Sequence, residues 1–249
     1  MESVKGTRSN SDKTSSNQEK ISENTQEEVK YRSFLVIAGG REPSHSWLKR
    51  TYEELGGESL LTVLCADKGL EYAVRSAIPV DYAFGDGDSC DFKIWSAMKN
   101  KQVVPCEKDY TDLQLAIQNV QGAGFCMITG VWGGRFDQLY ANVQVLIDLK
   151  KKQKCLTILA DEKERMIILT KGEALTLELK KNETDIVSVL SFTPEAKINI
   201  TGTKWVLNES GGNLIKIENP YTISNESLGG KVRVACFEGV VGFYIKSKE

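Results

Sequence analysis

The chain of 249 residues carries 32 Lys and Arg against 34 Asp and Glu, a formal net charge of -2 at pH 7. This near balance, without a basic stripe, argues against a nucleic-acid partner. No apolar run approaches the roughly 18 residues that a membrane-spanning helix needs, so we expect no membrane association. The length is enough for one large domain or two smaller ones, each with a real core.

The six cysteines are scattered and never form a C-x-x-C pair; they are Cys65, Cys90, Cys106, Cys126, Cys155 and Cys236. Most lie in apolar, strand-like contexts, which favours buried free thiols in a reducing compartment over a disulfide framework or a zinc site. With His45 as its one histidine, the chain is poorly equipped for a histidine-based metal site or a Ser-His-Asp triad. We therefore expect a cytoplasmic protein whose chemistry relies on other groups.

Residues 1–30 are rich in Ser, Asn, Glu, Lys and Gln and contain no aromatic side chain. Such a segment cannot bury enough surface to offset the entropy lost on ordering, so we predict a disordered tail. The segment has no apolar stretch of the kind found in secretory signals. Its many acids are also atypical of a mitochondrial presequence.

Residues 31–160 have the pattern of an α/β domain. The predicted order is strand 34–38, a helix capped by Ser46, strand 60–66, helix 70–76 and strand 80–84. Each of these strands is an apolar run that ends in Gly or Asp, which is typical of a doubly wound, Rossmann-like and mostly parallel sheet. Further on we expect a strand at 102–104, a helix with a Thr111–Gln114 capping box, strand 125–129, a helix from Phe136 to about 150, and strand 156–160.

Beyond residue 160 the pattern changes to short runs with little helical periodicity. These runs cover residues 166–169, 174–179, 186–192, 197–200, 213–217, 232–237 and 240–245. Turn residues such as Gly211-Gly212 and Gly229-Gly230 separate several of them. Many short strands at regular spacing predict an antiparallel β-sandwich or small barrel over residues 161–249.

Acidic residues follow the predicted strands of the first domain. Gly85-Asp86-Gly87-Asp88-Ser89 places two carboxylates between glycines, Asp67 ends the preceding strand, and Asp112 opens a helix. Singly, each is also ordinary turn or helix-start chemistry. The carboxyl ends of strands in open α/β sheets bind ligands, however, and four carboxylates gathered there would repel one another without a divalent cation. We therefore predict a Mg²⁺ site formed by Asp67, Asp86, Asp88 and Asp112.

A glycine-rich turn opens the helix at Phe136. Gly133 and Gly134 leave backbone N–H groups available and Arg135 adds a guanidinium, so this turn is suited to bind phosphate. The stretch does not match the G-x-x-x-x-G-K-[ST] pattern of a P-loop. Together with the acids, it predicts phosphoryl or pyrophosphoryl transfer from a nucleotide.

Five short motifs occur in an order that resembles the thiamine pyrophosphokinase family. They are Ala66-Asp67-Lys68-Gly69, Gly85-Asp86-Gly87-Asp88-Ser89, Asp109-Tyr110-Thr111-Asp112, Gly133-Gly134-Arg135-Phe136-Asp137 with Ala141-Asn142, and Ile223-Ser224-Asn225-Glu226 preceded by Thr203-Lys204-Trp205-Val206-Leu207-Asn208. The resemblance implies an α/β domain followed by a β-sandwich, a homodimer, and thiamine held between the α/β domain of one subunit and the sandwich of the other. It also implies transfer of the pyrophosphoryl group of ATP to the thiamine hydroxyl, with Mg²⁺ and release of AMP.

The resemblance also implies roles for single residues. Asp67, Asp86 and Asp88 would serve the metal and the polyphosphate, and Asp112 would contact the metal or position the thiamine hydroxyl. Arg135 would neutralise charge on the phosphates, whereas Ser224 and Asn225 would contact thiamine across the dimer interface. An acid near the hydroxyl can also assist its deprotonation, and the sequence leaves open which one. The expected ATP-binding set is Gly39, Gly40, Lys68, Asp86, Gly133, Gly134, Arg135 and Asp137.

The chain departs from the family pattern at four points. Lys68 replaces a usual Gly, Gly87 an apolar residue and Gln138 a usual His, while Phe243 and Tyr244 are insecure counterparts of an aromatic residue that stacks on thiamine. These departures bear on substrate affinity more than on reaction type. Two alternatives stay open: a pyrophosphokinase for another heterocyclic alcohol such as a pterin, and a non-catalytic nucleotide- or thiamine-binding protein.

Overall fold

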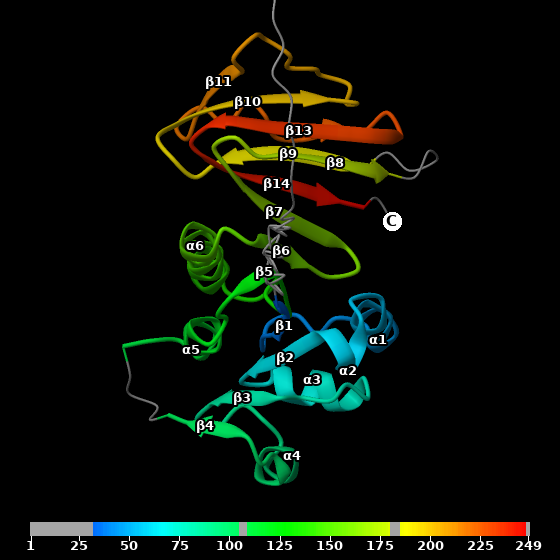
Figure 1. Cartoon of the computed structure of the whole chain (residues 1–249), viewed down its shortest axis with the longest axis vertical. Coiled ribbons are helices and arrows are strands. Elements are labelled where there is room, and N and C mark those ends of the chain that lie inside the picture. Colours follow the sequence, from blue (N-terminus) through cyan, green and yellow to red (C-terminus); the bar gives the residue numbers. More distant parts are fainter. Residues whose placement is uncertain (1–31, 105–108, 180–184, 248–249) are drawn as a thin grey trace, which may run out of the picture. The chain divides into compact units, whose positions relative to one another are not determined.

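The computed structural model describes residues 32–104, 109–179 and 185–247. The predicted disordered tail over residues 1–30 lies outside the described residues, and so does Cys106. The described chain forms two sheets and six helices (Figure 1).

A ten-stranded sheet has the order β12-β9-β14-β7-β6-β5-β1-β2-β3-β4. The half from β6 to β4 is parallel and consists of β1 (Arg32–Ile37), β2 (Leu61–Ala66), β3 (Tyr82–Gly85), β4 (Lys101–Val103), β5 (Ala123–Thr129) and β6 (Leu156–Ala160). Antiparallel pairing then adds β7 (Glu164–Thr170), β9 (Ile186–Ser191), β12 (Asn225–Glu226) and β14 (Val240–Lys246).

A second, four-stranded antiparallel sheet packs on the antiparallel half of the first. It has the order β11-β10-β13-β8 and consists of β8 (Ala174–Leu179), β10 (Glu195–Thr201), β11 (Asn213–Lys216) and β13 (Gly230–Glu238). One apolar core lies between the two sheets, with Phe243 and Ile198 fully buried in it. The predicted fold class, a mostly parallel α/β sheet followed by an antiparallel β-sandwich, is confirmed. The predicted division near residue 160 falls between β6 and β7, where one sheet runs on, and it stays a prediction.

Helices cover both faces of the parallel half. They are α1 (His45–Glu54), α2 (Gly57–Leu60), α3 (Gly69–Arg75), α4 (Phe92–Ala97), α5 (Asp112–Gln118) and α6 (Phe136–Gln153). Alternate residues of β1 belong to two apolar cores, one on each face of the sheet. Leu35 and Ile37 lie in a core with residues of α1 and α3, and Phe34 and Val36 lie in a core with residues of α5 and α6. β1 is therefore buried on both faces, which explains its unbroken apolar run.

Most helix and strand predictions agree with the structure, and the capping box of Thr111 and Gln114 is present at α5. The predicted cap at Ser46 is wrong, because α1 begins at His45 with Ser44 as its N-cap. The backbone of Ser44 is extended and its N–H donates to the carboxylate of Glu162 at 3.2 Å, a contact far away in the sequence. The short elements α2, α4 and β12 were not predicted.

The prediction of buried free thiols is confirmed for the described residues, whereas the reducing compartment stays a prediction. Cys65, Cys90, Cys126, Cys155 and Cys236 are all buried free thiols. Burial raises the pKa of the Cys90 and Cys236 thiols to about 11, so both are protonated at neutral pH. Burial also raises the pKa of the Cys65 and Cys126 thiols, so these four cysteines are poorly suited to act as nucleophiles.

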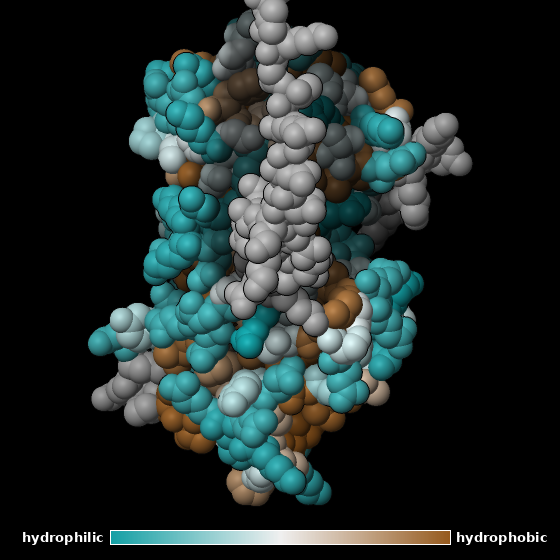
Figure 2. All heavy atoms as spheres, viewed as in Figure 1, coloured by the Kyte–Doolittle hydropathy of each residue, from teal (hydrophilic) through white to brown (hydrophobic). Residues whose placement is uncertain are grey.

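The surface of the described chain is mainly polar on the face seen in Figure 2, with apolar residues gathered toward the end where β3 and β4 lie. The exposed large side chains of β3, α4 and β4 include Tyr82, Phe92 and Val103. None of the helices that the structure describes is long and apolar enough to cross a membrane.

A buried ion pair joins α6 to the turn between β7 and β8. The Lys150 ammonium, 3% exposed, donates to the Glu173 carboxylate at 2.6 Å and to the Cys155 carbonyl at 2.8 Å. The other carboxylate oxygen of Glu173 accepts from the N–H and the hydroxyl of Thr170. Partial burial acts to raise the pKa of Glu173, but the hydrogen bonds from Lys150 and Thr170 outweigh it and hold that pKa below its ordinary value.

Replacing Glu173 by glutamine is expected to lower the free energy of unfolding at pH 7 by about 3 kcal/mol, because Lys150 stays buried without a counter-charge. A depressed carboxylate pKa stabilises the fold above the unfolded-state pKa, and this contribution disappears as the pH falls through the folded-state pKa. Urea unfolding should therefore show a gap between wild type and Glu173→Gln that is full at pH 7 and narrows only as the pH falls below 4.5, the ordinary glutamate pKa, toward the lower pKa of folded Glu173. Glu178→Gln is the control, because Glu178 is exposed on β8, and it should unfold like wild type at every pH. A gap between wild type and Glu173→Gln that does not change with pH would contradict the role assigned to the Glu173 carboxylate.

Candidate active site

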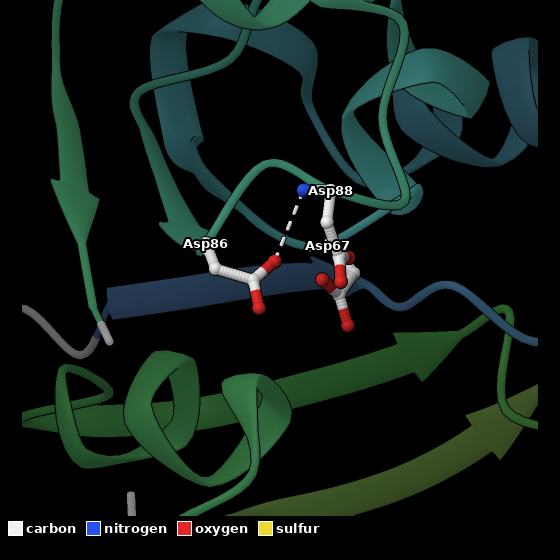
Figure 3. Close-up of side chains that lie close together, drawn as sticks. All are labelled: Asp67, Asp86 and Asp88. Carbon is white, nitrogen blue, oxygen red and sulfur yellow. Dashed lines mark hydrogen bonds between the residues drawn. The ribbon is translucent and has the colours of Figure 1, made fainter. Parts of the chain in front are cut away.

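Three carboxylates gather at the carboxyl ends of β2 and β3 (Figure 3). Asp67 follows β2, and Asp86 and Asp88 lie in the loop that follows β3. One oxygen from each side chain lies within 4.8 Å of the others. Opposite oxygen ligands of Mg²⁺ lie about 4.2 Å apart, so small side-chain rotations would bring all three onto one ion. The donor set, three carboxylate oxygens, fits this hard cation.

The backbone around the acids is shaped to bring them together. Asp67 has a φ of 52°, in the left-handed region that Asp tolerates better than most residues, and its N–H donates to the Phe84 carbonyl at 2.9 Å. This bond joins the ends of β2 and β3. A Cβ at Gly85 would lie 3.3 Å from a carboxylate oxygen of Asp67, so the bare backbone of Gly85 gives that side chain room.

The glycine between the two loop acids lies directly over a tryptophan ring. Gly87 has a φ of 82°, and a Cβ there would lie 2.5 Å from the indole nitrogen of Trp95 in α4. Trp95 is 8% exposed. Across this position the N–H of Asp88 donates to a carboxylate oxygen of Asp86 at 3.0 Å, which closes the turn. The structure thus explains one departure from the family pattern: Trp95 occupies the space that a side chain at position 87 would need.

Asp112 and Lys68 lie at helix starts near this edge. Asp112 is the first residue of α5, a helix that packs on β2 and β3, and its side chain is half-buried. It does not belong to the three-acid group found among the described residues. Lys68 is the N-cap of α3 and is exposed. The metal role of Asp112 and the ATP role of Lys68 stay predictions.

The second predicted element is the turn before α6. Gly133 and Gly134 have φ values of 72° and 69°, and Arg135 is the N-cap of α6. The Arg135 guanidinium binds both carboxylate oxygens of Asp137, at 3.1 and 2.5 Å. The hydrogen bond from Arg135, reinforced by its charge, holds the pKa of Asp137 below its ordinary value. Both side chains are largely exposed, so this ion pair can open when a phosphate competes for the guanidinium.

Gly39 and Gly40, in the loop after β1, lie between the loops that carry the acids and the loop after β5 that leads to α6. A Cβ on Gly39 would lie 3.3 Å from the Cβ of Lys68 and 3.4 Å from that of Asp67. The N–H of Gly40 donates to the Gly130 carbonyl at 2.6 Å, which ties the loop after β1 to the loop after β5. The loops after β1, β2, β3 and β5 therefore form one connected edge, as expected for a ligand site in an open α/β sheet.

Arg41, which sequence reasoning missed, fixes this edge to the second half of the chain. Its guanidinium donates to the Asp161 carboxylate at 2.9 Å and to Glu164 at 2.8 Å. The Tyr244 hydroxyl donates to the other oxygen of Glu164 at 2.7 Å. Tyr244 is thus held in a hydrogen-bond network and Phe243 is fully buried. Both residues, considered above as counterparts of an aromatic residue that stacks on thiamine, therefore have structural roles here.

The side chain of Asn225 forms its hydrogen bonds within its own chain. Its amide donates to the Thr203 hydroxyl at 3.2 Å and to the Trp205 carbonyl at 2.7 Å, while its oxygen accepts from the N–H groups of Trp205 and Glu226. These four bonds, two donated and two accepted, fill the hydrogen-bonding capacity of an Asn amide. Ser224, in contrast, is exposed and has a φ of 56°.

A small cavity of about 70 Å³ lies beside Asn225. Its lining residues are Ile200, Trp205, Leu207, Tyr221, Thr222, Ile223 and Asn225. Trp205 and Tyr221 are 56% and 50% exposed, and the Lys204 ammonium lies over the Trp205 ring, 4.7 Å from its centroid. The sequence contained the signal for Trp205, because it lies in the motif 203–208, but composition alone does not tell an exposed tryptophan from a core one.

Comparison with known families matches both halves of the chain. Residues 58–159 match the catalytic domain of thiamin pyrophosphokinase, and residues 174–241 match its vitamin B1 binding domain. Together the two matches cover more than half of the chain. The chain belongs to the thiamin pyrophosphokinase family. It has the function of a thiamin pyrophosphokinase, a transferase of the pyrophosphokinase class.

Solved structures share the thiamin pyrophosphokinase fold. The Bacillus subtilis thiamine pyrophosphokinase is 23% identical, with a TM-score of 0.73 over 88% of this chain and 100% of that chain. The Geobacillus thermodenitrificans enzyme is 24% identical, with a TM-score of 0.69 over 87% and 97%. The yeast thiamin pyrophosphokinase is 13% identical, with a TM-score of 0.66 over 88% and 87%. A comparison with curated protein sequences returned no match.

Proposed function

We propose that the protein transfers the pyrophosphoryl group of ATP to the hydroxyl of thiamine, giving thiamine diphosphate and AMP. The hydroxyl oxygen would form a bond to the β-phosphorus of ATP as the bond from that phosphorus to the α,β-bridging oxygen breaks. That oxygen would leave with AMP, and the hydroxyl proton would pass to a nearby carboxylate or to water. The observation that carries the proposal is the group of Asp67, Asp86 and Asp88 at one sheet edge, in a chain whose two halves match the two domains of this family.

Each candidate residue is proposed to contact the part of the substrate or the metal that its position in the site favours. Asp67, Asp86 and Asp88 would hold Mg²⁺, which supplies charge neutralisation for the polyphosphate. Arg135 would leave Asp137 to bind phosphate oxygens, beside the exposed backbone of Gly133 and Gly134. The exposed Lys68 and the backbone of Gly39 and Gly40 would complete the ATP-binding edge. Asp112 is proposed to position the thiamine hydroxyl or to contact the metal.

The hydrogen bonds of Asn225 favour a structural role for that residue over the direct contact with thiamine that the family resemblance implies. We propose that it shapes the thiamine pocket by holding the 203–205 loop, so that Trp205 presents its ring to the ligand. Aromatic faces suit thiamine, because its thiazolium ring is cationic and both of its rings are flat. Ser224 would make the direct polar contact.

A second copy of the chain is proposed to complete the site. In the ten-stranded sheet β12, which carries Asn225, is the first strand and β2, which leads to Asp67, is the eighth. Seven strand spacings put the two about 34 Å apart along the sheet, several times the length of thiamine. One chain therefore cannot bring Ser224 and Asp67 to the same substrate. A homodimer that pairs each sandwich with the partner's α/β edge would do so.

The alternatives are less well supported. A pterin pyrophosphokinase has no use for the vitamin B1 binding domain that residues 174–241 match. A non-catalytic binding protein would tolerate the loss of acids that catalysis needs, whereas Asp67, Asp86 and Asp88 are all present with one oxygen of each within 4.8 Å of the others. The five buried free thiols agree with a reducing compartment and so with the proposed cytoplasmic location.

A product assay tests the proposal. Purified protein is incubated with Mg²⁺, ATP and thiamine, and the nucleotides and thiamine esters are separated by chromatography. We expect AMP and thiamine diphosphate in equal amounts. ADP with thiamine monophosphate would show transfer of a single phosphoryl group instead. Product with a pterin alcohol but none with thiamine would support the alternative pyrophosphokinase.

A further inference from the structure

A buried carboxylate on α3 holds the far end of the loop that carries Asp86 and Asp88. Glu71 lies one turn after Asp67, and its side chain is 7% exposed. One carboxylate oxygen accepts from the N–H of Asp91 at 2.6 Å, and the other accepts from Arg75 at 2.6 Å. A carboxylate this deeply buried is costly unless it is paired, and here both oxygens have a donor.

The loop from Gly85 to Asp91 is fixed at both ends. At its start, Asp67 donates to the Phe84 carbonyl and Val104 donates to the Gly85 carbonyl, at 2.9 and 3.1 Å. At its end, Glu71 takes the N–H of Asp91, and the Asp91 side chain caps α4. Asp67 and Glu71 are joined through the start of α3, where the Leu70 N–H donates to the Asp67 carbonyl at 3.2 Å and the Glu71 N–H donates to the Lys68 carbonyl at 3.0 Å. A shift at Glu71 therefore changes where Asp86 and Asp88 lie relative to Asp67.

The same helix also reaches the loop after β1. The Tyr72 hydroxyl donates to the Gly40 carbonyl at 2.9 Å, and Arg75 donates to Glu42 at 3.2 Å. The first turns of α3 thus contact the chain after β1 on one side and the chain after β3 on the other. We propose that Glu71 is a positioning residue that sets the spacing of Asp67, Asp86 and Asp88 for a divalent cation. This inference rests on the proposed function, because it assumes that the three acids bind metal.

The test compares three variants by Mn²⁺ binding, followed by electron paramagnetic resonance in the presence of a non-hydrolysable ATP analogue. Glu71→Ala removes the acceptor for Asp91 and is expected to weaken Mn²⁺ binding about 10- to 100-fold. Glu71→Gln keeps an oxygen that can accept from Asp91 and should restore most of the affinity. Glu42→Gln changes only the distant end of the network and should bind Mn²⁺ like wild type.

The outcomes separate this inference from the function on which it rests. Wild-type affinity in Glu71→Ala, with only a lower melting temperature, would overturn the positioning role, and so would a Gln variant as weak as the Ala variant. If Glu71→Ala does not fold, Glu71→Leu fills the buried space without accepting a hydrogen bond and carries the same expectation. Absence of Mn²⁺ binding by wild type would instead overturn the metal site and with it the proposed function.

Discussion

Replacing Asp88 by asparagine is expected to lower kcat by about 10²- to 10³-fold, because the proposed metal ligand loses its charge and metal neutralisation of phosphate contributes several kcal/mol. The fold should be unaffected, since Asp88 is exposed and lies in a loop. The Ser89 hydroxyl donates a hydrogen bond to the Asp88 carboxylate at 2.8 Å, and the amide oxygen of an asparagine at position 88 can still accept this bond. The loss should therefore appear in turnover and metal affinity and not in stability.

The measurement is steady-state turnover over a range of Mg²⁺ concentrations, with thermal unfolding as the check on folding. Asp148→Asn on α6 is the matched control, because Asp148 is exposed and pairs only with Lys152 one turn away among the contacts described. High Mg²⁺ should recover part of the activity of Asp88→Asn, since the remaining carboxylates still offer ligands. Unchanged turnover at low Mg²⁺ would remove Asp88 from the metal site.

The gathering of the three acids could be predicted because it follows from topology. Asp67 and Asp86 each follow an apolar run, and parallel strands place their carboxyl ends at one edge whatever the details of packing. The capping box at Thr111 is a local signal over four residues, and for the same reason it was predicted correctly. Periodicity and turn chemistry thus give the fold class and the candidate site together.

Contacts between residues distant in sequence could not be predicted. Asn225 holds Thr203 and Trp205, some 20 residues away, and only the assembled sandwich shows that its amide is used inside the chain. Glu71 looks like an ordinary surface acid of a short helix until the Asp91 N–H is found against it. Ser44, rather than Ser46, is the N-cap of α1, and its N–H donates to Glu162 from another part of the fold, a contact that the local sequence does not show.

Gly87→Ala is the second substitution with a large expected effect. A Cβ at this position meets the Trp95 indole at 2.5 Å, and the φ of 82° is strained for alanine. The strain should lower the free energy of unfolding by about 1–3 kcal/mol. Relief of the clash must move Gly87, and with it Asp86 and Asp88 on either side. A shift of about 1 Å in reacting groups can cost about 10²-fold in rate, which is the loss of kcat expected here.

A double-mutant cycle with Trp95→Leu separates the clash from the backbone strain. The smaller leucine leaves room for a Cβ at position 87, so Gly87→Ala should cost less in that background, with a coupling of about 1 kcal/mol in urea unfolding. The activity lost through Gly87→Ala should likewise be smaller when position 95 is leucine. Strictly additive effects on stability and rate would show that Trp95 does not constrain the acid loop. Coupling in both would show that a glycine stands at position 87 because the ring of Trp95 occupies the space beneath it.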